Sequence, residues 1–222
     1  MPKVIIIVNA QVNAGKISPT SPVTEKMAMA LRNSIISCNQ NNEVEIIGGA
    51  QLWSKSFNKL NSQEDIIYCP LTIKLPDWFN FPAQHIYSAC RDLDKRRKWV
   101  NQHFGYKTTT DNLWLGNLWL PIIFTGDNII YREIISEGII PNSYQQPYEC
   151  PSHIYPLLQT LSYGLLQSIH AIPSVYLLQF TILDDNLIFD RIWPFPATPA
   201  IASIHQKPDD LFNAHWHCLN PH

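Results

Sequence analysis

The chain of 222 residues is long enough for one large domain or two small ones, and 45% of its residues are hydrophobic. A formal net charge of −2 gives no basic field that would attract nucleic acid. Charged residues make up only 15% of a chain that carries seven Trp, so we expect a covered surface, as in a homo-oligomer or a complex with a protein partner.

The spacing of the cysteines and the length of the apolar runs indicate which cellular compartment to expect. The five cysteines are widely separated and form no Cys-x-x-Cys pair, so we expect reduced, mostly buried thiols. The apolar run near the N-terminus is too short for a signal peptide. No segment reaches the roughly 18 apolar residues that a membrane span needs. We therefore expect a cytoplasmic protein that does not bind membranes.

The first half of the chain alternates between strand-like and helix-like segments. The expected strands lie at Lys3–Asn9, Glu43–Ile47 and Ile66–Leu71, and the expected helices lie at Val23–Cys38 and Pro82–Phe104. The first strand is a continuous β-branched run, which is typical of a strand buried on both faces. The alternation predicts an α/β fold that begins with a small parallel sheet and flanking helices, in residues 1–106.

In the second half, residues 107–222, the pattern of apolar and polar residues changes after a turn-rich stretch. Pairs of apolar runs around short polar turns predict two β-hairpins, and an apolar period of 3.6 residues predicts a helix between them. The hairpins are expected at residues 120–135 and 175–193, and the helix at Ser152–His170. These elements predict an α+β domain after a boundary near residues 107–118.

The loop after the first strand raises the question of a phosphate site. Lys16 follows a glycine, as in a P-loop, but Ile17 replaces the hydroxyl residue that would hold magnesium, and Ala10 replaces the first glycine. The sequence therefore argues against a P-loop. Lys16 remains a candidate contact for an anionic ligand at the carboxyl edge of the sheet, although an exposed polar loop is the simpler explanation.

Two separated stretches resemble the ATP-grasp superfamily. The stretch IYSACRDLDKRRKWVNQHFGY, residues 86–106, is similar to the helix after the first domain of those proteins. The stretch ILDDNLIFDRIWPFPATP, residues 182–199, resembles their late hairpin, in which Glu-x-Asn-x-x-Pro-Gly follows an acidic turn. The resemblance implies an ATP-grasp-like fold with lobes that grip ATP and magnesium. It makes ATP a candidate cofactor and Lys95 the candidate phosphate contact.

This sequence departs from the family pattern where the chemistry would be. In the second stretch, Arg191 stands at the Glu position and Trp193 at the Asn position, so two hard oxygen ligands for magnesium are missing. Phe124 or Thr125 stands where a second phosphate lysine is expected, and the glycine-rich lid is absent. The departures favour a protein that keeps the fold and binds a nucleotide or another small anion without standard magnesium chemistry.

Charged residues supply the remaining candidates. Arg91, Lys95 and Arg191 are the candidate anion contacts, but ion pairs along a solvated helix are the simpler explanation of the Arg91 and Lys95 cluster. Asp190 in an apolar strand and Glu133 on the other hairpin are candidate acid/base groups. Both are more commonly structural ion-pair partners.

The segment HWHC near the C-terminus contains two histidines that a strand would place on one face. His215 and His217 could bind a transition metal together with Cys218, His205 or Cys150. A single His-x-His pair without a regularly spaced partner favours simple packing, so we expect no metal site.

Three functions remain open from the sequence. The first is a degenerate ATP-grasp-like protein that binds a nucleotide or other small anion. The second is a non-enzymatic assembly or protein-interaction protein with an aromatic-rich surface, which the low charge and the Trp content favour. The third is an active ATP-dependent ligase with an atypical nucleotide site, acting through Asp190 or Glu133. The helix that carries Lys95 favours the first and the third.

Overall fold

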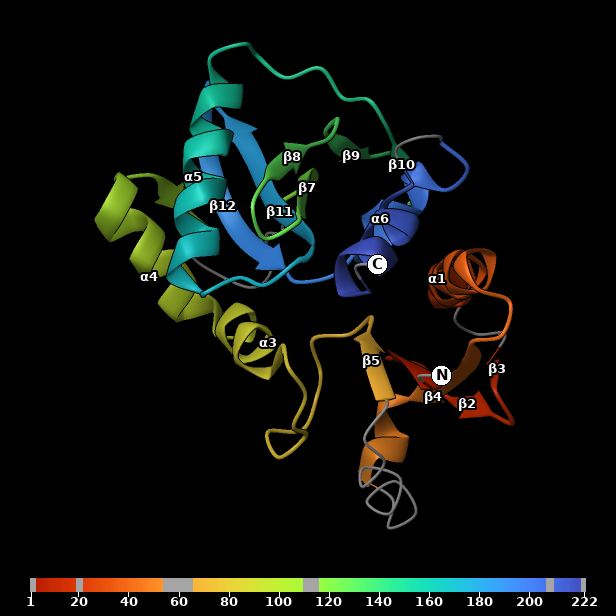
Figure 1. Ribbon diagram of the computed structural model, residues 1–222. Coiled ribbons are helices and arrows are strands. Elements are labelled where there is room, and N and C mark those ends of the chain that lie inside the picture. The colour runs from red at the N-terminus through yellow and green to blue at the C-terminus, as the bar shows by residue number, and fades with distance from the viewer. Residues whose placement is uncertain (1–2, 19–21, 54–65, 110–115, 207–209, 221–222) are drawn as a thin grey trace.

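A computed structural model of the protein describes residues 3–18, 22–53, 66–109, 116–206 and 210–220. The chain forms a small sheet and a large sheet, with helices beside and between them (Figure 1). None of the helices in these ranges combines the length and the apolar character needed to cross a bilayer.

The small sheet is parallel, as predicted, and its strands have the order β4-β1-β5. Its strands are β1 (Lys3–Val8), β4 (Glu43–Gly48) and β5 (Ile66–Pro70). The central strand β1 is buried along almost its whole length, because its neighbours and the helix α1 (Pro22–Cys38) cover it. A short hairpin, β2 (Val12–Asn13) and β3 (Lys16–Ile17), follows β1, and a 3-10 helix, η1 (Gly49–Trp53), follows β4.

The charged segment expected to form one helix over residues 82–104 forms two. Helix α3 (Gln84–Arg91) ends at Asp92, and helix α4 (Leu93–Phe104) begins after it. The Asp92 side chain accepts a hydrogen bond from the backbone N–H of Lys95 at 3.1 Å, which caps α4. The prediction of a single helix was wrong because Asp92 lies between the two helices and caps the second one.

The large sheet has the order β10-β9-β7-β11-β12-β6, with β8 paired to β7. Antiparallel pairing of β7 with β8, and of β11 with β12, confirms both predicted hairpins. The strands are β6 (Lys107–Thr108), β7 (Leu118–Phe124), β8 (Ile129–Tyr131), β9 (Ile135–Glu137), β10 (Tyr144–Gln145), β11 (Ser174–Leu183) and β12 (Asn186–Trp193). The predicted domain boundary stays a prediction, and part of it lies outside the described residues.

Two hydrophobic cores lie on opposite faces of the large sheet. Helices α3, α4 and α5 (Ile154–Ser168) cover one face, and α5 confirms the predicted helix between the hairpins. The other face packs on η2 (Thr198–Ser203), α6 (Leu211–Leu219) and the small sheet. Alternate residues of β11 enter different cores, as the pleat of a strand requires. Helix α6 lies beside α1 (Figure 1), which ties the two sheets together.

The HWHC segment is part of helix α6, so the prediction of a strand there was wrong. The Asp210 carboxylate accepts hydrogen bonds from the backbone N–H groups of Phe212 and Asn213, at 2.9 and 3.2 Å, and starts the helix. Residues two apart on a helix do not share a face. His215 is therefore buried, while His217 is exposed. Within the described ranges, no group of three His, Cys, Asp or Glu residues is placed to hold a metal ion.

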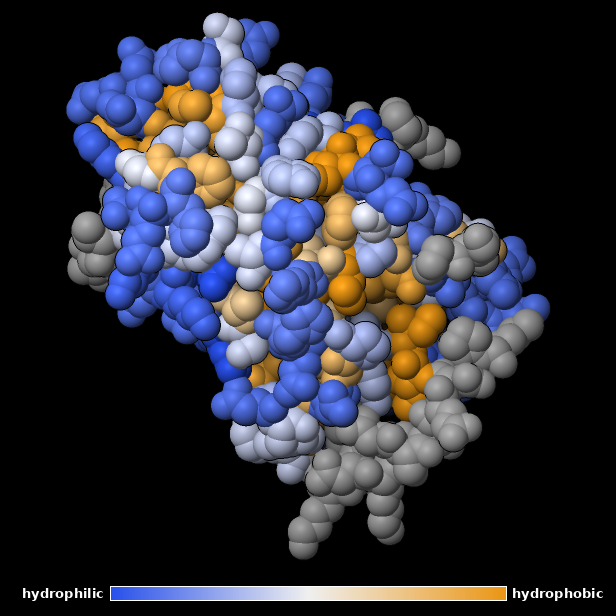
Figure 2. Space-filling model, turned by 60° about the vertical axis from the view of Figure 1, so that its left-hand side comes forward, coloured by the Kyte–Doolittle hydropathy of each residue, from blue (hydrophilic) through white to orange (hydrophobic). Residues whose placement is uncertain are grey.

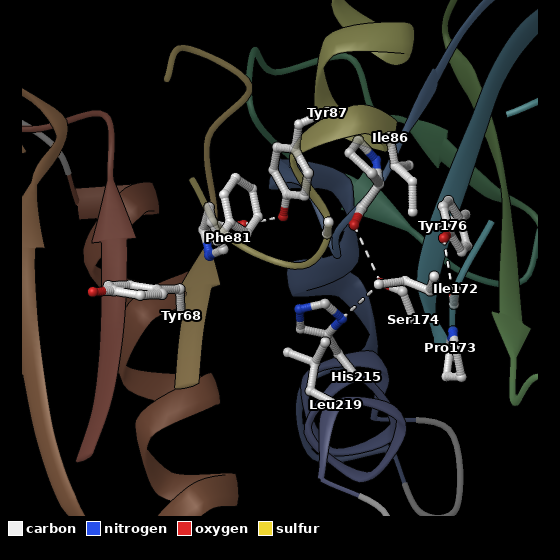
Figure 3. A pocket seen from close by; sticks show the side chains of 13 residues that line it. Tyr68, Phe81, Ile86, Tyr87, Ile172, Pro173, Ser174, Tyr176, His215 and Leu219 are labelled. Carbon is white, nitrogen blue, oxygen red and sulfur yellow. Dashed lines mark hydrogen bonds between the residues drawn. The ribbon is translucent and has the colours of Figure 1, made fainter. Parts of the chain in front are cut away.

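His215 lies in the core beside the start of β11 (Figure 3). Its Nδ1 accepts a hydrogen bond from the backbone N–H of Val175 at 3.4 Å and lies 3.2 Å from the Ser174 hydroxyl. The ring borders a cavity of about 20 Å³, which is too small for an organic ligand. Burial lowers the pKa of His215 to about 3, so the ring is neutral in the folded protein at neutral pH.

The buried ring makes stability depend on pH. The unfolded chain, whose histidine pKa is about 6.5, binds a proton that the folded chain excludes, so stability is full above that pH and falls as the pH drops towards 3. We expect His215→Gln to remove about 2 kcal/mol of the stability loss between pH 7 and pH 5. Urea unfolding at both pH values measures this loss. His217→Gln should retain it, and an equal loss in His215→Gln and the wild type would contradict the assignment.

Candidate functional site

A cavity of about 370 Å³ opens where the carboxyl ends of the parallel strands meet the large sheet. Its volume lies within the range of small-molecule sites. The residues that follow β1 and β5, the first turns of α1, and the inner face of β7, β11 and β12 all contribute side chains. The lining residues are Asn9, Thr24, Met27, Leu71, Thr72, Ile73, Lys74, Trp119, Tyr144, Gln179, Arg191, Trp193, Phe195, Ala197, Thr198 and Pro199.

The charged side chains at this cavity are all cationic. Lys74 lies at its exposed edge, and Arg191 projects from β12 with only 16% of its side chain exposed. Among the described residues that line the cavity there is no Asp or Glu. The arrangement therefore favours a negatively charged ligand.

Arg191 belongs to a buried network centred on Asp190. Oδ1 of Asp190 lies 2.7 Å from Nη2 of Arg97 and 3.2 Å from Nε of Arg191, and it also accepts from the Thr109 hydroxyl at 3.3 Å. Oδ2 accepts the backbone N–H of Gly116 at 2.9 Å. The Asp190 carboxylate is fully buried, and its two guanidinium partners come from α4 and β12.

The charges of this network do not cancel. Arg97 and Arg191 both pair with the single carboxylate of Asp190, so one positive charge is left over. Within the described parts of the chain, no second carboxylate pairs with either arginine. Buried charges are normally compensated. The surplus charge lies at Arg191, the arginine that faces the cavity.

The side chains around Arg191 are held in place by hydrogen bonds. The Arg191 guanidinium lies over the Trp193 ring, 5.5 Å from its centroid. The Trp193 indole N–H donates to Oε1 of Gln179 at 2.9 Å, and Nε2 of Gln179 donates to the Gly116 carbonyl at 2.6 Å. Gln179 and Arg191 face each other across β11 and β12. The cavity wall is therefore largely formed before any ligand enters.

Of the four anion contacts predicted from the sequence, the structure places only Arg191 in this cavity. Lys16 is exposed on β3, and Lys95 is exposed on α4. Arg91 pairs with Asp77 beside a separate cavity of about 420 Å³ next to α3.

The two predicted acid/base groups lie outside the cavity lining. Glu133 is exposed between β8 and β9. Asp190 is surrounded by four donors, an arrangement that favours the ion-pair alternative over a group that exchanges protons with a substrate. Their catalytic role stays a prediction.

Sequence reasoning missed Lys74, Arg97 and Gln179. Arg97 falls on the apolar stripe of its helix, and Gln179 interrupts the apolar run VYLLQFTIL. A polar residue at a buried position needs a partner, so both positions carried a usable signal. Lys74, in an irregular segment after β5, carried none.

Loss of the Asp190 charge should destabilise the fold strongly. In Asp190→Asn, the buried guanidinium of Arg97 loses its counter-ion, which costs about 3–5 kcal/mol. Urea unfolding of the variant and the wild type measures the difference. Glu133→Gln is the matched control and should change stability by less than about 0.5 kcal/mol, because Glu133 is exposed. A loss below about 1 kcal/mol in Asp190→Asn would contradict a structural role.

The sequence matches no protein-family model and no curated protein. The fold, in contrast, matches solved structures over almost the whole chain. N5-carboxyaminoimidazole synthetase from Staphylococcus aureus, complexed with ADP, has a TM-score of 0.62 at 12% identity, covering 98% of this chain and 77% of that chain. L-amino acid ligase from Bacillus licheniformis has a TM-score of 0.64 at 9% identity, covering 99% and 75%.

A third match names the fold family directly. A protein from Archaeoglobus fulgidus described as an ATP-grasp superfamily protein has a TM-score of 0.57 at 10% identity, covering 91% of this chain and 84% of that chain. Identities this low show the fold alone. The chain has an ATP-grasp-like fold, in agreement with the resemblance of its two sequence stretches.

Proposed function

We propose that the protein binds a small organic anion in the 370 Å³ cavity between its two sheets, without a divalent metal ion. The observation that carries this proposal is the shared carboxylate of Asp190. Arg97 and Arg191 are largely buried, with 7% and 16% of their side chains exposed, and together they have one counter-ion among the described residues. A ligand anion at Arg191 would make the number of negative charges equal to the number of arginines.

Two further sources of positive potential meet at the same cavity. Thr24 lies in the first turn of α1 and lines the cavity, so the positive end of the helix dipole is close to it. Lys74 adds an exposed cation at the cavity. Arg191, the helix terminus and Lys74 come from three different parts of the chain, and all three favour an anion.

Magnesium, which the ATP-grasp fold implies, does not suit these residues. Magnesium takes oxygen ligands, mostly carboxylates, phosphates and water. Here Arg191 and Trp193 stand on β12, and the amide of Gln179 opposite them is already hydrogen-bonded at both of its ends. A guanidinium repels a metal cation and attracts the anion that a metal would otherwise bind. The donor set therefore favours metal-independent anion binding over ligase chemistry.

A protein-interaction role is the second candidate, and one observation favours it. Trp53 and Trp78 are 67% and 44% exposed, and their ring centroids are 5.6 Å apart. Figure 2 shows apolar patches between hydrophilic residues on one face of the molecule. Tryptophan is enriched among the residues that contribute most of the binding energy at protein interfaces. The two functions are compatible, because these residues do not line the anion cavity.

A thermal-shift titration tests anion binding. ATP, ADP and inorganic phosphate are titrated in EDTA and then in excess magnesium. A ligand that binds only the folded state stabilises it by about 2.7 kcal/mol at 100 times its Kd. We expect at least one anion to raise the melting temperature in EDTA, and Arg191→Gln to abolish the shift because the surplus charge is gone.

Lys95→Gln is the control, because Lys95 is exposed and lies outside the cavity lining. It should leave the shift unchanged. Loss of the shift in Lys95→Gln, with retention in Arg191→Gln, would assign the ligand to the α4 surface instead. A shift that requires magnesium would contradict the metal-independent proposal.

A further inference from the structure

We infer that the ligand of this cavity is a planar aromatic acid, whose anionic group binds the free edge of Arg191 and whose ring packs on an aromatic wall. The wall consists of Trp119, Tyr144, Trp193 and Phe195. The inference rests on the proposed function and specifies the ligand class. The anionic group is a carboxylate or a phosphate, since both suit the same guanidinium geometry.

The wall is made of two aromatic pairs. The ring centroids of Trp119 and Tyr144 are 5.6 Å apart at 83°, and those of Trp193 and Phe195 are 6.0 Å apart at 68°. Trp193 and Tyr144 are only partly buried by the protein, and both line the cavity. Aromatic rings favour stacked or edge-on contact with another ring. A flat aromatic body therefore fits this wall better than a flexible aliphatic chain does.

Hydrogen bonds hold the Trp193 side of the wall in place. The Trp193 indole N–H donates to Gln179, and the Gln179 amide group donates to the Gly116 carbonyl. These bonds fix the Trp193 ring at its edge, and the Arg191 guanidinium covers one of its two faces. The wall can therefore offer apolar ring surface to a ligand at little cost in side-chain ordering.

The orientation of Arg191 fixes where the acid group lies. Its Nε is engaged by Asp190, and its guanidinium lies over Trp193, so among the described residues the two Nη groups form the available edge. That edge presents parallel N–H donors to a carboxylate or phosphate. Because the guanidinium and the Trp193 ring are in contact, the acid group and the aromatic ring of the ligand must be separated by few bonds.

A matched ligand set tests the inference by isothermal titration calorimetry in EDTA. The probes are 2-naphthoate, its saturated non-planar counterpart decahydro-2-naphthoate, neutral 2-naphthamide and 2-naphthyl phosphate. We expect 2-naphthoate or 2-naphthyl phosphate to bind the wild type at least tenfold more tightly than decahydro-2-naphthoate. We expect no binding of 2-naphthamide, and no binding of any probe to Arg191→Gln.

Two variants of the aromatic wall separate the contribution of ring stacking to binding from the contribution of the anionic charge. Trp193→Leu and Tyr144→Leu should each reduce the preference for the planar acid at least threefold and leave the affinity for decahydro-2-naphthoate nearly unchanged. Tyr144 lies on the short edge strand β10, so its substitution is informative even where Trp193→Leu fails to fold. Lys95→Gln should match the wild type with every probe.

The outcomes distinguish this inference from the proposed function. Equal binding of the planar and the saturated acid, both lost in Arg191→Gln, would overturn the aromatic ligand class and leave anion binding intact. Failure of every anion, including ATP, ADP and phosphate, would overturn both. Tighter binding of 2-naphthyl phosphate than of 2-naphthoate would support the inference and assign phosphate as the acid group.

Discussion

The rest of this structure depends on the ion pairs and hydrogen bonds that the Asp190 carboxylate makes. It joins Arg97 of α4, Arg191 of β12 and the backbone of Gly116 in one fully buried cluster. Removal of either arginine would leave the remaining pair electrically neutral. Within the described residues, the presence of both leaves a positive charge without a counter-ion, and Arg191 presents that charge to the cavity. The same cluster thus holds a helix against the large sheet and gives the cavity its charge.

The fold and the site lead to different expectations of function. The fold is shared with enzymes whose structures include an ADP complex, and shared fold does not establish shared chemistry. At this site a fixed guanidinium, backed by Asp190 and stacked on Trp193, occupies the position where the family resemblance expects a metal ligand. A built-in cation needs no divalent ion to attract an acid, and its planar set of N–H donors binds a carboxylate or phosphate in a defined orientation. The aromatic wall beside it adds selectivity for shape.

Local patterns predicted most of the fold and only part of the site. The β-branched run of β1, the turns of both hairpins and the apolar period of α5 are strong, local signals, and all were confirmed. The single helix expected over residues 82–104 and the strand expected for the HWHC segment were wrong, because in each case one capping carboxylate, Asp92 or Asp210, determines where a helix begins. Arg191 was predicted from the family pattern. Its partner network was not, because Arg97 and Asp190 are 93 residues apart and no local pattern connects them.

The central claim is that the surplus charge at Arg191 binds an anion in the cavity between the sheets. Anomalous diffraction from crystals soaked in bromide locates anion sites directly. We expect the strongest bromide peak to contact the Nη edge of Arg191, and to be absent from crystals of Arg191→Gln. Bromide peaks confined to other surfaces, with an equally ordered Arg191 side chain in both crystals, would contradict the account.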